Sequence, residues 1–534
     1  MKINNESNVD VIRPLGLLER YFQITHDIEH YYNVGLLIRY KVPLKFSLVS
    51  TPSTPIPTDT KDAILKILYP TLERMISKQQ ALAVVFADLY SSKPLFIRLR
   101  EIDLSRIVRF AVVNDDKDIE KLLEEEHNKK FDVEDQTSPL WRIVVGIKSA
   151  CNEREISNDW NLFFGIFWHH TIGDGRSALV MYTSFHESLL EILSEISDYT
   201  KEPTTKIKLP KHSTIPLGKP IEECLEFKFT LAQTVKELLK FYLLPTFFVK
   251  KQLKGYWLGD NPSFSFTKNN TKTLFYSITA EELNTLLRLS KQHKTTITSI
   301  FNIALVFSAY HHLILGSNQD DNNLSKNARE LAPFDAIKLA TCINLRPYTT
   351  PLTPWTQMGV YISGSESIYK YPISKITDDN NYPQLDFWKM CKEFRSDLIN
   401  NGIPHAINFL GNLNLLPNES QKYKDVLRNK ADDRIMGRDC SMMVSSIGKF
   451  SELTSGNPSA NEWKVNDLIF CQSSVTMYSA FTINVISFED KLTFTICYQD
   501  GVANHNKVEK FGEGTVKCLK KLVQNENVSL QDLA

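Results

Sequence analysis

The segment 162–175 constrains the fold of this chain more than any other part of its sequence. It reads LFFGIFWHHTIGDG, an apolar run that ends in His169 and His170 and leads to Gly173, Asp174 and Gly175. Seven residues of mixed aromatic and aliphatic type predict a buried strand. The two glycines permit a sharp backbone turn that bulkier residues would resist. Because neighbouring strand side chains point to opposite faces, one histidine can face a cavity while the other packs behind it.

This arrangement predicts an enzyme with a histidine general base, since an imidazole titrates near physiological pH and can accept a proton from an alcohol or an amine. The spacing alone also fits a pair of structural histidines. Asp174 lies beyond the turn, so we expect its carboxylate to point into the fold, where an unpaired charge is costly. Arg346, in the sequence Ile343-Asn-Leu-Arg-Pro347, is the expected cationic partner. Asp174 would then brace the loop that carries His170 and transfer no proton.

Composition and charge exclude several classes of function. The chain has 534 residues, enough for two to four domains, and its 62 basic residues equal its 62 acidic ones. No overall charge therefore steers it toward nucleic acid. Its eight cysteines have no CxxC spacing, which predicts reduced cytosolic thiols. Motifs of serine hydrolases, P-loop enzymes, HExxH zinc enzymes and dinucleotide-binding folds are absent, and no third ligand near His169 and His170 predicts a metal site.

The order of predicted elements indicates a layered α/β fold in two parts. Residues 1–199 form a predicted N-terminal domain, 200–225 a proline- and lysine-rich linker, and 226–534 a C-terminal domain. Helical spacing is predicted over 59–79, 177–196 and 508–523, and an almost wholly apolar core helix over 298–310. Thr279 and Glu282 fit a capping box. Residues 481–488 and 492–498 alternate in polarity and predict a hairpin.

One apolar segment bears on the location of the protein. Residues 241–249 are flanked by lysines, and the segment 236–254 could lie in a membrane interface or form a linker helix that packs across the protein. The polar first residues predict no signal peptide, and no run is predicted to reach the roughly 20 apolar residues of a membrane span. We therefore expect a cytoplasmic protein, with peripheral membrane association as an additional expectation.

Several motifs together resemble those of the CoA-dependent acyltransferase superfamily, which includes chloramphenicol acetyltransferase. His169-His170-Thr-Ile-Gly-Asp174-Gly175 matches its HHxxxDG signature in full. Phe131-Asp132 with Pro139-Leu-Trp-Arg142 resembles the pattern before the active-site strand, and Asn344-Leu-Arg346 resembles the arginine motif that pairs with the aspartate.

Within this superfamily the chain is most similar to the fungal alcohol O-acetyltransferases, over residues 12–520. The stretches that carry this likeness are Leu18-Glu-Arg-Tyr-Phe22, Thr296-Ile-Thr-Ser-Ile-Phe301, Ser445-Ser-Ile-Gly448 and Asp467-Leu-Ile-Phe470. The DFGWG motif of the plant enzymes is absent.

The resemblance implies two chloramphenicol acetyltransferase-like domains with mixed sheets and flanking helices, joined by a crossover linker and separated by an active-site tunnel. It implies acetyl-CoA as co-substrate, a small or medium alcohol as acceptor, acetate esters as products and no metal. His170 would be the base and Asp174 the brace, supported by His169, Gly173, Gly175 and Arg346. Ser445 or Ser446 would supply or adjoin the oxyanion donor.

Two alternatives for the function and two further expectations stay open at this point. The acceptor could be an amine or a long-chain amino alcohol, because an imidazole deprotonates either nucleophile. The chain could also be a non-catalytic binding protein that retains the fold. The family's tendency toward the endoplasmic reticulum or lipid droplets agrees with the basic-apolar segment and the lysine-bearing C-terminal helix. We expect a monomer.

Overall fold

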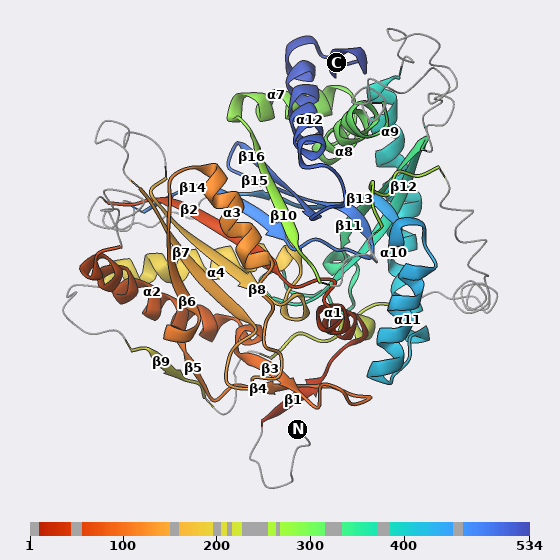
Figure 1. Cartoon of the computed structure of the whole chain (residues 1–534). Coiled ribbons are helices and arrows are strands. Elements are labelled where there is room, and N and C mark those ends of the chain that lie inside the picture. Colours follow the sequence, from red (N-terminus) through yellow and green to blue (C-terminus); the bar gives the residue numbers. More distant parts are fainter. Residues whose placement is uncertain are drawn as a thin grey trace.

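The computed structural model describes residues 10–43, 56–149, 160–195, 204–210, 216–226, 255–262, 268–315, 334–370, 385–451 and 463–533 (Figure 1). The segment 236–254 and Cys151 lie outside these residues, so the interpretations placed on them stay predictions.

A five-stranded mixed sheet carries the predicted strand at its centre. Its order is β14-β2-β8-β7-β6, with β6 parallel to β7 and the other pairs antiparallel. The strands are β2 (Val34–Lys41), β6 (Val108–Val113), β7 (Trp141–Lys148), β8 (Leu162–Trp168) and β14 (Lys464–Gln472). All seven residues of β8 are buried, as the unbroken apolar run predicts.

A six-stranded mixed sheet lies in the second half of the chain, in the order β10-β16-β15-β13-β11-β12. Its strands are β10 (Thr271–Ile278), β11 (Ala336–Asn344), β12 (Ile362–Lys370), β13 (Cys440–Phe450), β15 (Ser479–Phe488) and β16 (Lys491–Gln499). The predicted hairpin is confirmed as β15 and β16, which pair antiparallel from Phe481–Tyr498 to Phe488–Lys491. A small antiparallel sheet consists of β1 (Val11–Pro14), β4 (Leu95–Arg98) and β3 (Val84–Ala87), in that order. A second small antiparallel sheet pairs β5 (Glu101–Asp103) with β9 (Lys206–Lys208).

Helices cover both sheets (Figure 1). The first half contributes α1 (Leu17–Asp27), α2 (Thr58–Lys78), α3 (Asp116–His127) and α4 (Gly175–Glu195). The second half contributes α7 (Ala280–Gln292), α8 (Ile297–Ala309), α9 (Phe387–Asp397), α10 (Ile403–Leu410), α11 (Ser420–Asp432) and α12 (His505–Asn525). Helices α2 and α4 pack on each other over the first sheet, whereas α7, α8, α9 and α12 form one group that packs on one face of the second sheet (Figure 1). The predicted capping box at the start of α7 is confirmed: Thr279 accepts from the N–H of Glu282, and the Glu282 side chain accepts from the N–H of Thr279.

Helix α8 and the π-helix after it, Tyr310–Leu315, differ from the prediction in one respect. Residues Ile297–Ile314 are long and apolar enough to cross a membrane, although the sequence was expected to contain no such run. A large share of this stretch, 78%, is buried inside the protein. It therefore packs as the predicted core helix, between α9 and α12.

Strand β14 ties the two sheets together. It lies within the range predicted for the C-terminal domain, but it pairs along its length with β2 of the N-terminal sheet, from Lys464–Lys41 to Gln472–Val34. Asp467 of β14 is fully buried and binds Arg39 of β2 as well as Lys491 of β16. The hydroxyls of Thr493 and Thr495, both in β16, donate to the carbonyls of Leu468 (2.7 Å) and Phe470 (3.0 Å). Both sheets are thus held in register beside the end of β8.

Candidate active site

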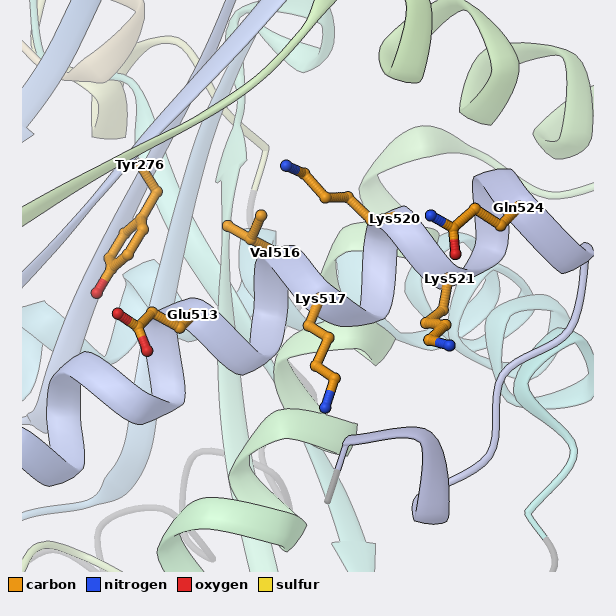
Figure 2. Close-up of a pocket in the computed structure, with 7 residues that line it drawn as sticks. All are labelled: Tyr276, Glu513, Val516, Lys517, Lys520, Lys521 and Gln524. Carbon is orange, nitrogen blue, oxygen red and sulfur yellow. The ribbon is translucent and has the colours of Figure 1, made fainter.

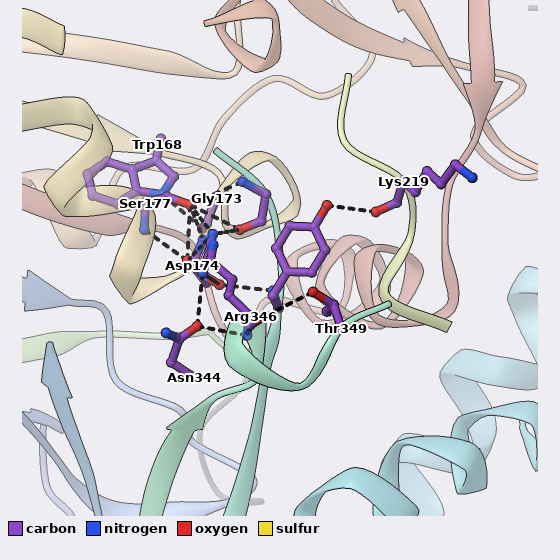
Figure 3. Close-up of polar contacts among 10 residues, drawn as sticks. Trp168, Gly173, Asp174, Ser177, Lys219, Asn344, Arg346 and Thr349 are labelled. Carbon is purple, nitrogen blue, oxygen red and sulfur yellow. Dashed lines mark hydrogen bonds and ion pairs between the residues drawn. The ribbon is translucent and has the colours of Figure 1, made fainter. Parts of the chain in front are cut away.

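The histidine pair lies where β8 ends. Trp168, the last residue of the strand, faces Val34 of β2 and Trp141 of β7 across the sheet. The chain then turns through a short 3-10 helix, His170–Ile172, and enters α4 at Gly175. The indole N–H of Trp168 donates to the carbonyl of Gly173 (2.9 Å) and closes this turn. The strand end and the first turn of α4 therefore form one rigid corner (Figure 3).

The two glycines are required by space more than by backbone freedom. The φ angle of Gly173 is −174°, an extended value that any residue adopts. A Cβ on Gly173 would lie 2.9 Å from Cβ of Ser177 and 3.0 Å from Nε1 of Trp168. A Cβ on Gly175 would lie 2.8 Å from Cγ2 of Ile447. The chain turns at these glycines as expected, but the reason differs: they allow close packing around the corner and do not adopt a backbone conformation closed to other residues.

His170 has an aromatic environment. Its ring stacks on Phe22 of α1, with centroids 3.7 Å apart and planes within 5°, and lies 5.4 Å from the ring of Tyr31. The residue is 5% exposed, and its Nδ1 is buried with no hydrogen-bond partner beyond its own backbone. Burial lowers the pKa of His170 to about 4, although its own backbone and the charge of Asp174 oppose this shift. The imidazole is therefore neutral at pH 7, in the form that accepts a proton.

His169 faces a different set of side chains. Its Nδ1 accepts from the N–H of Thr171 (3.1 Å), which fixes the ring and leaves its hydrogen on Nε2. The ring lies 4.4 Å from that of His26 and 5.6 Å from that of Phe86. Burial and the neighbouring His170 lower the pKa of His169 to about 3. The two histidines thus contact different side chains, as expected, but not through strand alternation, because β8 ends at Trp168 and His170 begins the 3-10 helix.

Asp174 and Arg346 form a fully buried, bidentate ion pair (Figure 3). The guanidinium donates from Nη1 to Oδ2 (2.8 Å) and from Nη2 to Oδ1 (3.1 Å). Oδ1 also accepts from the backbone N–H and hydroxyl of Ser177 (2.9 and 3.0 Å), and Oδ2 from the N–H of Tyr361 (2.9 Å). Burial alone would raise the pKa of Asp174, but Arg346 and these hydrogen bonds outweigh it and hold the pKa below its ordinary value. Five donors occupy the carboxylate, which leaves it no role as a base.

The residues around Arg346 extend the brace across the molecule. Arg346 comes two residues after the end of β11, and its Nη1 also donates to Asn344 (3.2 Å). Tyr361 stands directly before β12, and its hydroxyl donates to the carbonyl of Lys219 (2.8 Å) in the predicted linker. Figure 3 shows Arg346 and Asn344 below Asp174 and Lys219 to its right. The corner after β8 is thus bound to the second sheet and to the linker.

The two serine candidates have different positions on β13. Ser445 is buried, its Oγ lies 3.4 Å from where a Cβ on Gly175 would stand, and it interacts with the thiol of Cys342. Ser446, the next residue, is exposed, as expected for the opposite face of the strand. The structure therefore brings Ser445, but not Ser446, to the corner that carries His170.

Sequence reasoning missed four residues of this site. Phe22 and Tyr31 border His170, His26 borders His169, and Ser177 binds Asp174. The spacing of Asp174 and Ser177 is an N-cap pattern that could have predicted their contact, because α4 begins at Gly175. Phe22 ends one of the family-like stretches. His26 and Tyr31 carry no signal of this kind.

Neither of two small cavities in the described residues opens on His170. One, of about 360 Å³, lies on the surface of α12 and β10 and is lined by Tyr276, Lys517, Lys520 and Lys521 among others (Figure 2). The other, of about 10 Å³, touches Thr171 and Ile172. The tunnel that the resemblance implies therefore stays a prediction. Within the described residues, no group of three or more His, Cys, Asp or Glu side chains is placed to hold a metal ion.

Comparisons with known proteins agree with this geometry. The sequence profile of the alcohol acetyltransferase family matches residues 61–522. A probable alcohol acetyltransferase, crmB, of Aspergillus fumigatus is 22% identical over 527 residues, which is 95% of this chain and 99% of the relative.

Two solved structures share the fold. A trichothecene 15-O-acetyltransferase from Fusarium sporotrichioides matches with a TM-score of 0.60 at 12% identity, over 95% of this chain and 94% of that one. A wax ester synthase/diacylglycerol acyltransferase from Marinobacter aquaeolei VT8 matches with a TM-score of 0.52 at 14% identity, over 96% of this chain and 100% of that one. The predicted fold class is confirmed: two lobes of mixed α/β structure, of the CoA-dependent acyltransferase type. With the profile covering most of its length, this chain belongs to the alcohol acetyltransferase family.

Proposed function

We propose that this protein transfers the acetyl group of acetyl-CoA to the hydroxyl of a small or medium alcohol and forms an acetate ester, with His170 as general base. Members of this family generally transfer an acyl group from an acyl-CoA. The observation that carries the proposal is a neutral imidazole, His170, on a turn that the buried Asp174–Arg346 pair holds in place.

The proposed reaction follows from the free nitrogen of this ring. Because Nδ1 of His170 is buried, Nε2 is the atom available to the acceptor. Nε2 takes the hydroxyl proton while the acceptor oxygen bonds to the thioester carbonyl carbon. When the tetrahedral intermediate collapses, the carbon–sulfur bond breaks and the imidazolium returns its proton to the thiolate. Atoms and charges balance without a covalent acyl-enzyme.

The tetrahedral oxyanion requires a hydrogen-bond donor. Loss of one such donor in other enzymes costs about 3 kcal/mol of transition-state stabilisation. Ser445 is the better candidate, since its hydroxyl adjoins Gly175 whereas Ser446 is exposed. An amine acceptor remains the alternative, because His170 would deprotonate it equally well, and a non-catalytic binding protein remains the third possibility.

Replacement of His170 by alanine is expected to lower the rate of acetyl transfer by about 10²- to 10⁴-fold, the usual contribution of a positioned base. The measurement is release of CoA thiol that depends on added acceptor, with alcohols and amines tested in parallel and products identified by mass. His405→Ala, on the exposed side of α10, is the matched control and should retain the wild-type rate. A His170→Ala enzyme with normal turnover would refute the assignment, and product masses decide between ester and amide.

Replacement of Asp174 by asparagine should lower both stability and activity, because it leaves the Arg346 guanidinium buried without a counter-charge. Breaking a buried pair in this way typically costs about 3–5 kcal/mol. Urea unfolding measures the loss. Lys449→Ala removes a half-exposed ion pair with Asp490 and should cost at most about 1 kcal/mol. A fully stable and active Asp174→Asn variant would discredit the brace.

The value of kcat/KM should not fall near pH 6.5, where an ordinary histidine base becomes protonated. Since burial lowers the pKa of His170 to about 4, the free enzyme keeps its base unprotonated through pH 6.5, and kcat/KM should fall only at lower pH. A half-maximal value near pH 6.5 in a folded enzyme would contradict this.

Unfolding must be followed at each pH as a control for that measurement. In the folded protein, burial lowers the pKa of His127 and of His169 to about 3. Like that of His170, these values lie below the histidine pKa of the unfolded chain. The unfolded chain therefore binds more protons below pH 6.5. The free energy of unfolding should accordingly fall as the pH drops from 6.5 toward 4.

We further propose peripheral binding to an anionic lipid surface, which would concentrate hydrophobic alcohols near the enzyme. Lys517, Lys520 and Lys521 of α12 line one surface pocket together with Glu513 (Figure 2), and Lys520 also pairs with Glu282. The lysine-flanked segment 236–254 lies outside the described residues. Flotation with vesicles that contain acidic phospholipid tests this. The protein should float with them at low salt and less at high salt, and the Lys517→Glu/Lys521→Glu variant should float less. A protein that stays wholly in the soluble fraction would count against it.

A further inference from the structure

A chain of buried hydrogen bonds leads from the second sheet to the side of His170. The hydroxyl of Tyr31 donates to Oε1 of Gln472 (2.8 Å), and Nε2 of Gln472 donates to Oδ1 of Asn484. Nδ2 of Asn484 donates to the hydroxyl of Thr495 (3.1 Å), which donates to the carbonyl of Phe470 (3.0 Å). All four side chains are buried.

The direction of every bond in this chain follows from its far end. The carbonyl of Phe470 can only accept, so the single hydrogen of the Thr495 hydroxyl is directed to it. Thr495 must therefore accept from an N–H of Asn484, which turns the amide oxygen of Asn484 toward Gln472. By the same reasoning Gln472 presents its oxygen to Tyr31, and Tyr31 must donate. The carbonyl of Phe470 thus fixes which atom of each amide, in Asn484 and in Gln472, is the oxygen and which the nitrogen. Heavy-atom positions alone leave these two assignments ambiguous.

The register of the first sheet explains why this chain ends beside the base. Gln472 of β14 faces Val34 of β2, which faces Trp168 of β8. Tyr31 lies three residues before Val34, and His170 lies two residues after Trp168. Their rings lie 5.4 Å apart, with Phe22 next to both.

The oxygen of Tyr31 therefore keeps a lone pair that can accept a hydrogen bond but has no hydrogen left to donate, since its only hydrogen is directed to Gln472. Burial and, to a smaller extent, Cys342, whose thiol hydrogen-bonds with Ser445, raise the pKa of Tyr31. A simple alcohol has one hydroxyl hydrogen, and the base requires it. An acceptor must carry a second donor hydrogen to satisfy Tyr31 as well.

We propose that Tyr31 is a specificity residue that selects acceptors with a second hydrogen-bond donor beside the nucleophilic hydroxyl, as in 1,2-diols and β-amino alcohols. The inference deepens the proposed acetyl transfer and depends on it. The nucleophilic hydroxyl gives its proton to His170 while the neighbouring hydroxyl or amine donates to the oxygen of Tyr31. A plain alkanol must either leave the accepting lone pair of Tyr31 unused or give Tyr31 the single hydrogen that His170 requires.

The test compares 1-hexanol with 1,2-hexanediol, which share a carbon chain, as acceptors for acetyl-CoA. In the wild-type enzyme kcat/KM should favour the diol by about 2- to 10-fold, the usual effect of one neutral hydrogen bond. Tyr31→Phe keeps the ring against His170 and removes the oxygen, so the ratio of the two kcat/KM values should fall toward the value of about 1 expected without that bond.

Two further variants separate this role from a general structural effect. Gln472→Met should also lower the ratio, because it frees the hydroxyl of Tyr31 to rotate and act as a donor. Tyr40→Phe, which removes another buried hydroxyl of the same sheet, one bonded to His186 (2.9 Å), should keep the wild-type ratio.

Two distinct results would overturn the inference. A wild-type enzyme that acetylates both acceptors without favouring the diol, or a Tyr31→Phe variant with an unchanged ratio, refutes it and leaves the proposed function intact. If the wild-type enzyme acetylates neither acceptor nor any other alcohol, the proposed function fails, and the inference fails with it.

Discussion

The buried ion pair between Asp174 and Arg346 is the interaction on which the site depends. It joins the corner after β8 to the segment between β11 and β12, so that the position of His170 is set only when both sheets have assembled. Both side chains are 0% exposed, and each would be an uncompensated buried charge without the other. The additional hydrogen bonds from Ser177 and Tyr361 fix the orientation of the carboxylate. An isolated N-terminal half would carry the HHxxxDG sequence but would lack the partner that orders it.

Burial has two opposite effects on the base. It keeps His170 neutral and thus able to accept a proton, but it also disfavours the imidazolium that forms when the proton arrives. Two neighbours offset the second effect. The face of Phe22 lies 3.7 Å from the imidazole, where an aromatic ring attracts a cation, and the carboxylate of Asp174 contributes a favourable charge. A stacked ring also holds the imidazole in one plane, which leaves Nε2 directed at a single location.

Local signals in the sequence predicted much of this structure, and contacts between distant segments account for what they missed. The burial of β8, the capping box of α7 and the β15–β16 hairpin each depend on neighbouring residues. The Asp174–Arg346 contact was predictable because a buried carboxylate requires a cation. By contrast, the pairing of β14 with β2 joins segments more than 400 residues apart, and β14 carries no signal that assigns it to the first sheet. Likewise, the close packing around Gly173 involves Met358, and Phe22 reaches His170 only through the packing of α1.

The insertion of β14 into the first sheet has a chemical consequence. Asp467, which binds Arg39 and Lys491, and the hydroxyls of Thr493 and Thr495 hold this strand against both β2 and β16. Since side chains alternate along a strand, a shift of one residue would turn Gln472 away from Tyr31 and Asn484. The register of β14 therefore determines whether Tyr31 can present a bare oxygen lone pair beside His170. The second half of the chain thus acts on the site through Gln472. This residue determines that Tyr31, which the first half supplies, accepts a hydrogen bond and does not donate one.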